Sequence, residues 1–86
     1  MKIEQAFGEV LKKYRLQLHI SQEELAHQSG LDRTFISLLE RGKRKPTLNT
    51  VFSICKCLKN EPHIIIQEVE KLIYENNEKD NIDFEG

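Results

Sequence analysis

Residues 21–40 read SQEELAHQSGLDRTFISLLE, and their spacing is that of two short helices joined by a tight turn. Ser21 is a good N-cap residue, and Glu24 three positions later completes the pattern of a capping box. Gly30 adopts positive φ at no steric cost, so it ends this helix and turns the chain sharply. Asp32 then caps a second helix, whose inward residues are Phe35, Ile36 and Leu39. The pattern predicts a helix-turn-helix.

The small and apolar residues of this segment have separate tasks. Ala26 lets the two helices approach closely, where a larger side chain would push them apart. The space between the helices is filled by Leu25, Leu31, Ile36 and Leu39. Each of these residues alone is more often plain core than motif, but together, at this spacing, they are a specific signal.

Helical periodicity continues on both sides, and no segment alternates as a half-buried strand does. A first helix of roughly residues 2–18 carries Ile3, Phe7, Val10, Leu11, Tyr14 and Leu18 at steps of three and four. Gly42 ends the helix that Asp32 begins, and residues 43–46 form a loop. Thr47 caps a fourth helix. Asn60 is the left-handed residue expected at its end. The inner face of this helix is expected to contain Leu48, Val51, Phe52, Cys55 and Leu58. We therefore expect an all-α fold, a compact five-helix bundle.

The fifth helix, predicted over residues 62–74 from Pro62 onward, is apolar on more than one stripe. Such a helix needs more than one partner surface, and in so short a chain the second is expected to be another copy. The candidate dimer interface is drawn from Ile64, Ile65, Ile66, Val69 and Ile73. We expect one domain over residues 1–74 and an acidic, frayed tail over residues 75–86.

The charge of the chain is unevenly distributed. The net charge of −1 over 86 residues, taken as a total, is unfavourable for binding nucleic acid. Yet residues 1–74 hold 12 basic and 9 acidic residues, a net +3, whereas residues 75–86 hold one basic and five acidic residues, a net −4. From Arg33 to Lys45 there are five basic residues and one acidic residue. This basic block is the electrostatic footprint of a nucleic-acid-binding protein, although taken alone a solvated loop explains it equally well.

Composition and motifs argue against several other classes of protein. Hydrophobic residues are 38% and charged residues 31% of the chain, which suits a soluble globule. No apolar run approaches the ~18–20 residues of a membrane span, and the N-terminus lacks a signal peptide, so we expect a cytoplasmic protein.

Catalytic and metal chemistry find no support in the sequence. Cys55 and Cys57 point in different directions on a helix, so they are better read as core thiols than as a metal or redox pair. His19, His27 and His63 lie far apart without ligand spacing, and no glycine-rich phosphate loop occurs. We expect no enzyme, no metal and no cofactor.

The segment resembles the Cro/repressor type of helix-turn-helix regulator, the XRE family, over about residues 8–72. The resemblance rests on Arg15, on the run Ser21-Gln22-Glu23-Glu24-Leu25-Ala26, and on Gly30-Leu31, Ile36-Ser37, Glu40-Arg41-Gly42 and Pro46-Thr47. Residues 31–37, LDRTFIS, are also similar to controller proteins of restriction–modification systems. His19 departs from the pattern, which usually has Gly there, but histidine tolerates positive φ better than bulky residues do.

The resemblance implies a lambda-repressor-like DNA-binding domain whose recognition helix, about residues 32–40, enters the major groove. It implies that base edges face Arg33, Thr34, Ser37 and Leu38. An Arg33 guanidinium suits guanine, because it donates bidentately to O6 and N7. Phosphate contacts are implied for Gln22, Arg41, Lys43, Arg44 and Lys45, and a structural ion pair for Arg15 and Glu40.

We therefore expect a transcriptional regulator that binds double-stranded DNA as a homodimer. Its two recognition helices would lie roughly 34 Å apart on a (pseudo)palindromic operator. No ligand-sensing domain fits in the chain, so no small-molecule ligand is expected. The alternatives are an antitoxin whose tail binds a toxin, and a protein-interaction module that retains the fold without DNA binding. The intact basic block argues against the second alternative.

Overall fold

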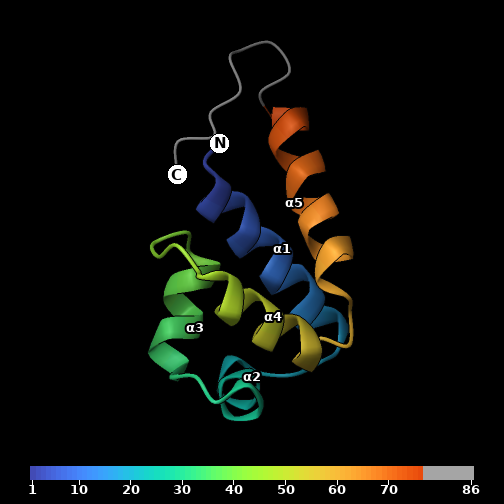
Figure 1. The fold of residues 1–86 in the computed structure, drawn as a ribbon. Helices are drawn as coiled ribbons and strands as arrows, with labels where there is room; N and C mark the ends of the chain where they lie inside the picture. The colour runs from blue at the N-terminus through green and yellow to red at the C-terminus, as the bar shows by residue number, and fades with distance from the viewer. Residues whose placement is uncertain (77–86) are drawn as a thin grey trace.

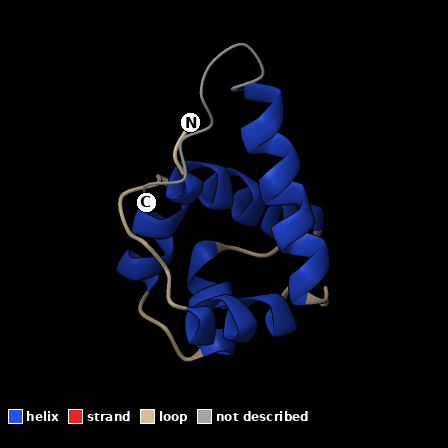
Figure 2. Ribbon diagram, turned by 45° about the horizontal axis from the view of Figure 1, so that its top comes forward, coloured by secondary structure: helices blue, strands red, loops and turns tan. Residues whose placement is uncertain are grey.

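The computed structural model describes residues 1–76, which contain five helices and no strand (Figures 1 and 2). The helices are α1 (Ile3–Gln17), α2 (Gln22–Ser29), α3 (Arg33–Glu40), α4 (Leu48–Cys57) and α5 (Pro62–Asn76). The expected all-α five-helix fold is confirmed. α5 continues two residues into the segment assigned to the tail, and the rest of that segment, residues 77–86, lies outside the described residues.

The helix ends follow the capping residues of the sequence closely. Ser21 Oγ accepts a hydrogen bond from the Glu24 amide at 3.0 Å, and Thr47 Oγ1 accepts one from the Thr50 amide at 3.1 Å. Asp32 occupies the N-cap position of α3, although its side chain makes no capping bond. Gly30 has a φ of 71°, so the turn between α2 and α3 has the left-handed conformation that the sequence predicted.

In the described part of the chain, two residues other than glycine have positive φ. His19 (φ 57°) stands where the family usually has Gly, and it adopts the left-handed conformation. At the end of α4 the left-handed residue is Lys59 (φ 58°), so the expectation for Asn60 was wrong. α4 ends at Cys57, which moves the left-handed position to Lys59, and the Asn60 amide then bonds back to the Cys55 carbonyl at 3.1 Å.

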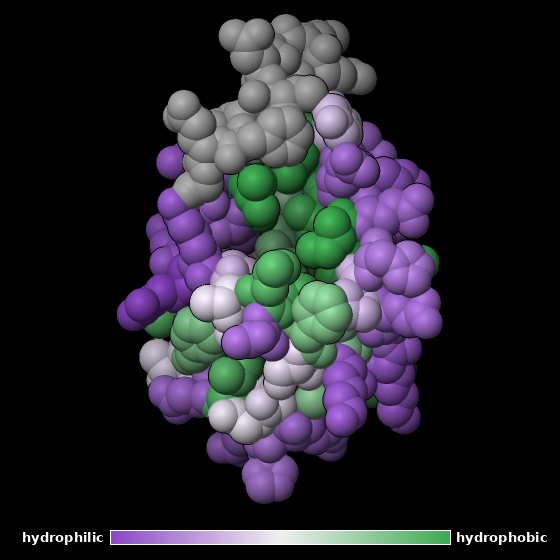
Figure 3. Space-filling model, viewed as in Figure 1, coloured by the Kyte–Doolittle hydropathy of each residue, from purple (hydrophilic) through white to green (hydrophobic). Residues whose placement is uncertain are grey.

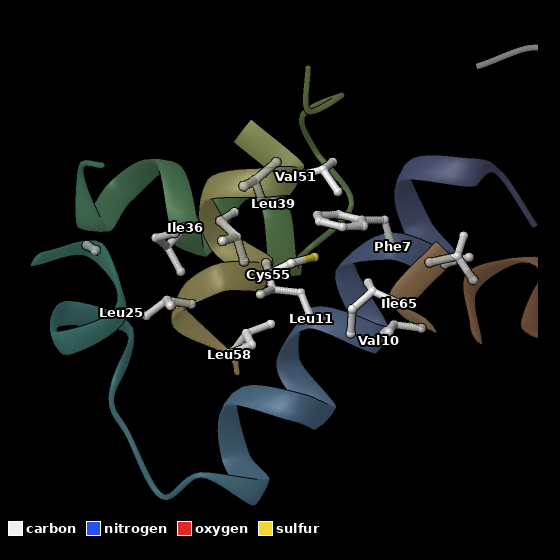
Figure 4. Close-up of a cluster of buried hydrophobic side chains, with 14 of the residues drawn as sticks. Phe7, Val10, Leu11, Leu25, Ile36, Leu39, Val51, Cys55, Leu58 and Ile65 are labelled. Carbon is white, nitrogen blue, oxygen red and sulfur yellow. The ribbon is translucent and has the colours of Figure 1, made fainter. Parts of the chain in front are cut away.

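α1 lies between α3 and α5 (Figure 1). It packs against α3 and α5, while α2 packs against α3 and α4, and α4 also packs against α5 (Figure 1). The shared core contains Leu11, Leu25, Ile36, Leu39, Leu58 and Ile65, which are fully or almost fully buried (Figure 4). Burying a side chain of this size contributes roughly 1.5–3 kcal/mol, so the core fixes how α3 lies on the rest of the domain.

α5 uses its main apolar stripe inside the protomer. Ile65, Val69 and Ile73 are 0%, 5% and 2% exposed. Ile65, Val69 and Ile73 belong to the core of the protomer, where α5 packs against α1 and α4, and a dimer contact through some of the five α5 residues stays a prediction. Ile64 is half-buried, and Ile66 remains 46% exposed.

On α4, two residues that were expected to be buried are exposed. Leu48 and Phe52 were expected on its inner face, but they are 74% and 58% exposed. The buried stripe of α4 is instead Val51, Ile54, Cys55 and Leu58. Leu48 and Phe52 lie one turn apart on the flank of this stripe, where none of the helices within residues 1–76 buries them.

Candidate nucleic-acid interface

The outer face of α3 presents the four residues expected to read bases. Arg33 and Thr34 are exposed in its first turn, and Ser37 and Leu38 follow one turn later, partly exposed. Ile36 and Leu39 occupy the opposite, buried face. Because helical residues four apart share a face, the four outward side chains form one surface. Phe35 is partly buried and packs against the core.

A buried ion pair fixes the C-terminal end of α3. Arg15 Nε and Nη2 donate to the two carboxylate oxygens of Glu40, at 2.5 Å and 3.0 Å. Arg15 Nη1 also donates to the Ile20 carbonyl at 2.8 Å. The ion pair implied by the resemblance is therefore present, and it connects α1, the chain entering α2 and the end of α3.

Gln22, the first residue of α2, joins the same carboxylate. Its Nε2 donates to Glu40 Oε1 at 2.9 Å, and the side chain is partly buried. The resemblance implies a phosphate contact for Gln22, but the structure directs its side chain to Glu40. The backbone amides of the first turn of α2 are what remains to face an anion at this position.

Four cations of the basic block follow directly after α3, in the loop that leads to α4. Arg41, Lys43, Arg44 and Lys45 are all exposed. Among residues 1–76, none of the four forms an ion pair within 4.0 Å, since the three ion pairs involve other residues. Gly42 turns the chain with a φ of 70°, and the Lys43 amide bonds to the Leu38 carbonyl at 2.9 Å. The cations are thereby held next to the end of α3.

Lys45 has surroundings of its own. It lines a groove of about 280 Å³ between the start of α1, the loop, the start of α4 and the middle of α5. The groove is otherwise lined by Ile3, Glu4, Phe7, Pro46, Leu48, Val51, Ile66 and Val69. This groove was not expected from the sequence, because Leu48 was assigned to the core.

Gly8 is a second feature that was not expected from the sequence. A Cβ at this position would lie 2.4 Å from the Leu39 carbonyl oxygen and 2.7 Å from that of Glu40. α1 therefore crosses the C-terminal end of α3 at a distance that only glycine permits. The available signal was a glycine inside a predicted helix, which costs about 1 kcal/mol relative to alanine and usually has a packing reason.

The described residues contain no group of three His, Cys, Asp or Glu side chains placed to hold a metal ion. Within the same residues, no helix has the length and apolar character needed to cross a membrane.

Comparison with known proteins assigns the chain to a family. A helix-turn-helix family model matches residues 11–65. The control protein C.SmaI of Serratia marcescens is 41% identical over 58 residues, which cover 67% of this chain and 69% of the relative. C.BamHI of Bacillus amyloliquefaciens is 40% identical over 57 residues, covering 65% and 70%.

A solved structure supports the same assignment. The restriction–modification controller protein C.Esp1396I, as a tetramer in complex with its natural 35-base-pair operator, is 35% identical. The match has a TM-score of 0.74 and covers 80% of this chain and 91% of the other. The chain therefore belongs to the helix-turn-helix family of the Cro/repressor (XRE) type, and it is similar to restriction–modification controller proteins.

Proposed function

We propose that this protein is a transcriptional regulator that binds double-stranded DNA sequence-specifically, with α3 in the major groove. The observation that carries the proposal is the outward face of α3, flanked by cations that form no ion pair within the described residues. In this arrangement Arg33, Thr34, Ser37 and Leu38 contact base edges. Arg33 donates hydrogen bonds to a guanine. Leu38 makes an apolar contact with a base, such as with the methyl group of a thymine.

The phosphate contacts fix the position of α3 on the duplex. Arg41, Lys43 and Arg44 supply charge beside the end of α3. The first turn of α2 supplies backbone amides and the positive end of a helix dipole. Gln22 takes part through its backbone, because its side chain is held by Glu40. These contacts carry no sequence information, but they provide salt-dependent affinity.

The protein acts as a homodimer on a (pseudo)palindromic operator. Two observations support this part of the proposal. Leu48, Phe52 and Ile66 are large apolar side chains that are 74%, 58% and 46% exposed, and Leu48 and Ile66 line the same groove, as expected of an interaction surface. Apolar side chains gather over α4 and between the start of α1 and α5 on the face shown in Figure 3. C.Esp1396I, a similar protein, assembles as a tetramer on its operator. Of the interface residues expected on α5, Ile64 and Ile66 remain available for contact with a second protomer.

The similar proteins indicate which genes this protein is proposed to regulate. Because C.SmaI and C.BamHI are control proteins, we propose that this chain regulates the genes of a restriction–modification system. The DNA upstream of its own gene is then the first operator to examine.

Selection from a random-sequence duplex library tests the proposal. The chain should enrich an inverted repeat whose half-sites lie one turn of DNA, or a multiple of it, apart. Footprinting of the DNA upstream of its own gene should protect a matching site. Sedimentation of the complex should show two protomers bound to each inverted repeat. Enrichment of no sequence, with equal affinity for every duplex, would contradict the proposal.

A further inference from the structure

We propose that Ser53 of α4 is a positioning residue for sequence recognition: it holds the C-terminal end of α2 and, through the turn that follows, the first turn of α3. This role rests on the proposed function, because it requires that α3 reads bases. It goes beyond that function by naming a residue outside the helix-turn-helix that sets specificity without contacting DNA.

A hydrogen bond joins α4 to the end of α2. The Ser53 side chain is partly buried, and its hydroxyl donates to the Ser29 carbonyl at 3.2 Å. Ser29 is the last residue of α2, so its carbonyl has no acceptor role within its own helix. Within residues 1–76, this is the one side-chain hydrogen bond that joins α4 to another helix. α4 is itself anchored in the core by Val51, Ile54 and Cys55. The bond therefore links the end of α2 to a helix that the core holds in place.

The turn between α2 and α3 passes this attachment on to α3. Gly30 has a φ of 71°, and the Leu31 amide donates to the Ala26 carbonyl at 2.9 Å, so the turn is bonded to the last turn of α2. Arg33, the first residue of α3, comes four positions after Ser29. A shift of the end of α2 therefore shifts the start of α3.

The two ends of α3 are held in different ways. The C-terminal end carries Glu40, whose carboxylate accepts hydrogen bonds from side chains of α1 and α2. At the N-terminal end, the Asp32 side chain makes no capping hydrogen bond. Leu31 packs against the core there, but apolar contacts have no preferred direction. The bond from Ser53 supplies a directional contact at this end of the motif.

Base recognition depends on this placement more strongly than phosphate binding does. Arg33 and Thr34 lie about 10 Å along α3 from Glu40, so a rotation of about 5° around that end moves them by about 1 Å. A bidentate contact to guanine needs both donors within hydrogen-bond distance, and the short Thr34 side chain cannot follow its base. The flexible side chain of Lys43 adjusts to a phosphate after the same movement. Loss of the hydrogen bond should therefore weaken recognition of the operator and leave the electrostatic affinity unchanged.

Ser53→Ala tests the assignment in the full chain. Its affinity for the operator found by library selection should fall about twofold to tenfold, the range expected from one hydrogen bond between uncharged groups. Its affinity for a random duplex, and the salt dependence of both affinities, should equal those of the wild type. Ser53→Thr retains the hydroxyl and should restore the operator affinity. Ser29→Ala is the matched control, because it removes the Ser29 hydroxyl but keeps the carbonyl that Ser53 binds.

Two further measurements accompany the titrations. Circular dichroism and urea unfolding establish that each variant is folded under the conditions of binding. The carbonyl carbon resonance of Ser29 in NMR spectra should shift in Ser53→Ala and stay near its wild-type position in Ser53→Thr, which reports on the hydrogen bond itself.

The outcomes separate this role from the proposed function. A wild-type chain with equal affinity for every duplex would contradict the proposed function, and the role of Ser53 with it. A wild-type chain that prefers its operator, together with a Ser53→Ala chain whose preference is equally large, would overturn the positioning role alone. Equal losses on the operator and on random DNA would assign Ser53 to stability, and would overturn the positioning role as well.

Discussion

Gln22 donates a hydrogen bond to Glu40 across 2.9 Å, so the first residue of α2 is tied to the last residue of α3. The same carboxylate receives two hydrogen bonds from Arg15, which is buried. Both helices of the motif are therefore held by one acceptor. A buried ion pair of this kind adds little net stability compared with an apolar replacement, but removing one partner is costly. We interpret the cluster of Arg15, Gln22 and Glu40 as a device that orients α3.

Gln22→Ala should lower the free energy of unfolding by about 1–2 kcal/mol, because it removes a hydrogen bond to a buried charged group. Urea unfolding measures the change, and Gln28→Ala is the control, since Gln28 is exposed on the same helix. Unchanged stability, together with weaker binding to every duplex, would assign the Gln22 side chain to a phosphate instead.

Arg33→Ala should weaken binding to the selected operator by roughly 1–3 kcal/mol and relax specificity at one base pair. The reason is the loss of a bidentate contact to a base, which random DNA does not offer in register. Titration of both duplexes at one salt concentration provides the comparison. Equal losses of affinity for the operator and for random DNA would show that Arg33 does not recognise a base.

Lys43→Ala should weaken binding to all sequences and reduce the slope of log affinity against log salt by roughly one unit. The lost contact neutralises a phosphate and releases its counterion. Lys71→Ala is the matched control, because Lys71 is an exposed lysine on α5. The same slope in the Lys43 variant as in the wild type would mean that Lys43 does not contact DNA.

Gly8→Ala should destabilise the fold by about 1–3 kcal/mol, because the added methyl group meets two backbone carbonyl oxygens that cannot rotate away. Gly30→Ala is the comparison. Nothing lies within 4 Å of its Cβ, so only its positive φ opposes the change, at a cost of about 1–2 kcal/mol. We expect Gly8→Ala also to weaken operator binding under conditions in which the variant is folded. A more stable Gly8→Ala protein, as helix propensity alone would give, would contradict the close approach.

Cys55 should resist thiol reagents in the folded protein. Burial raises the pKa of this thiol from 9.0 to about 11, since the thiolate would lose its hydration. A Cys57→Ser chain isolates Cys55, which should react slowly when folded and rapidly in denaturant. The folded state keeps the Cys55 thiol protonated up to a higher pH than the unfolded state does. The contribution of this thiol to the free energy of unfolding is therefore fully present below pH 9 and is lost as the pH rises towards 11. Rapid labelling of the folded variant at neutral pH would contradict this prediction.

The sequence by itself determined the features that act over a few residues. The caps at Ser21 and Thr47 and the left-handed turn at Gly30 depend on the chemistry of one residue and its neighbours, so they could be read directly. The buried face of α3, with Ile36 and Leu39, followed from the helical period, whereas the base-facing set was implied by the family resemblance. The basic block was equally local, because its residues are nearly consecutive.

Only the tertiary structure decided which apolar faces are buried. α4 and α5 carry apolar residues on more than one stripe, and periodicity within one helix does not say which stripe a neighbour covers. The packing of the helices settled that choice. α1 packs against α3 and α5, which buries Ile65 and places Gly8 against the end of α3, and α4 packs against α2 and α5, which leaves Leu48 and Phe52 in solvent. The hydrogen bond from Gln22 to Glu40 joins residues 18 positions apart, and it exists only because the packed helices bring the two ends together.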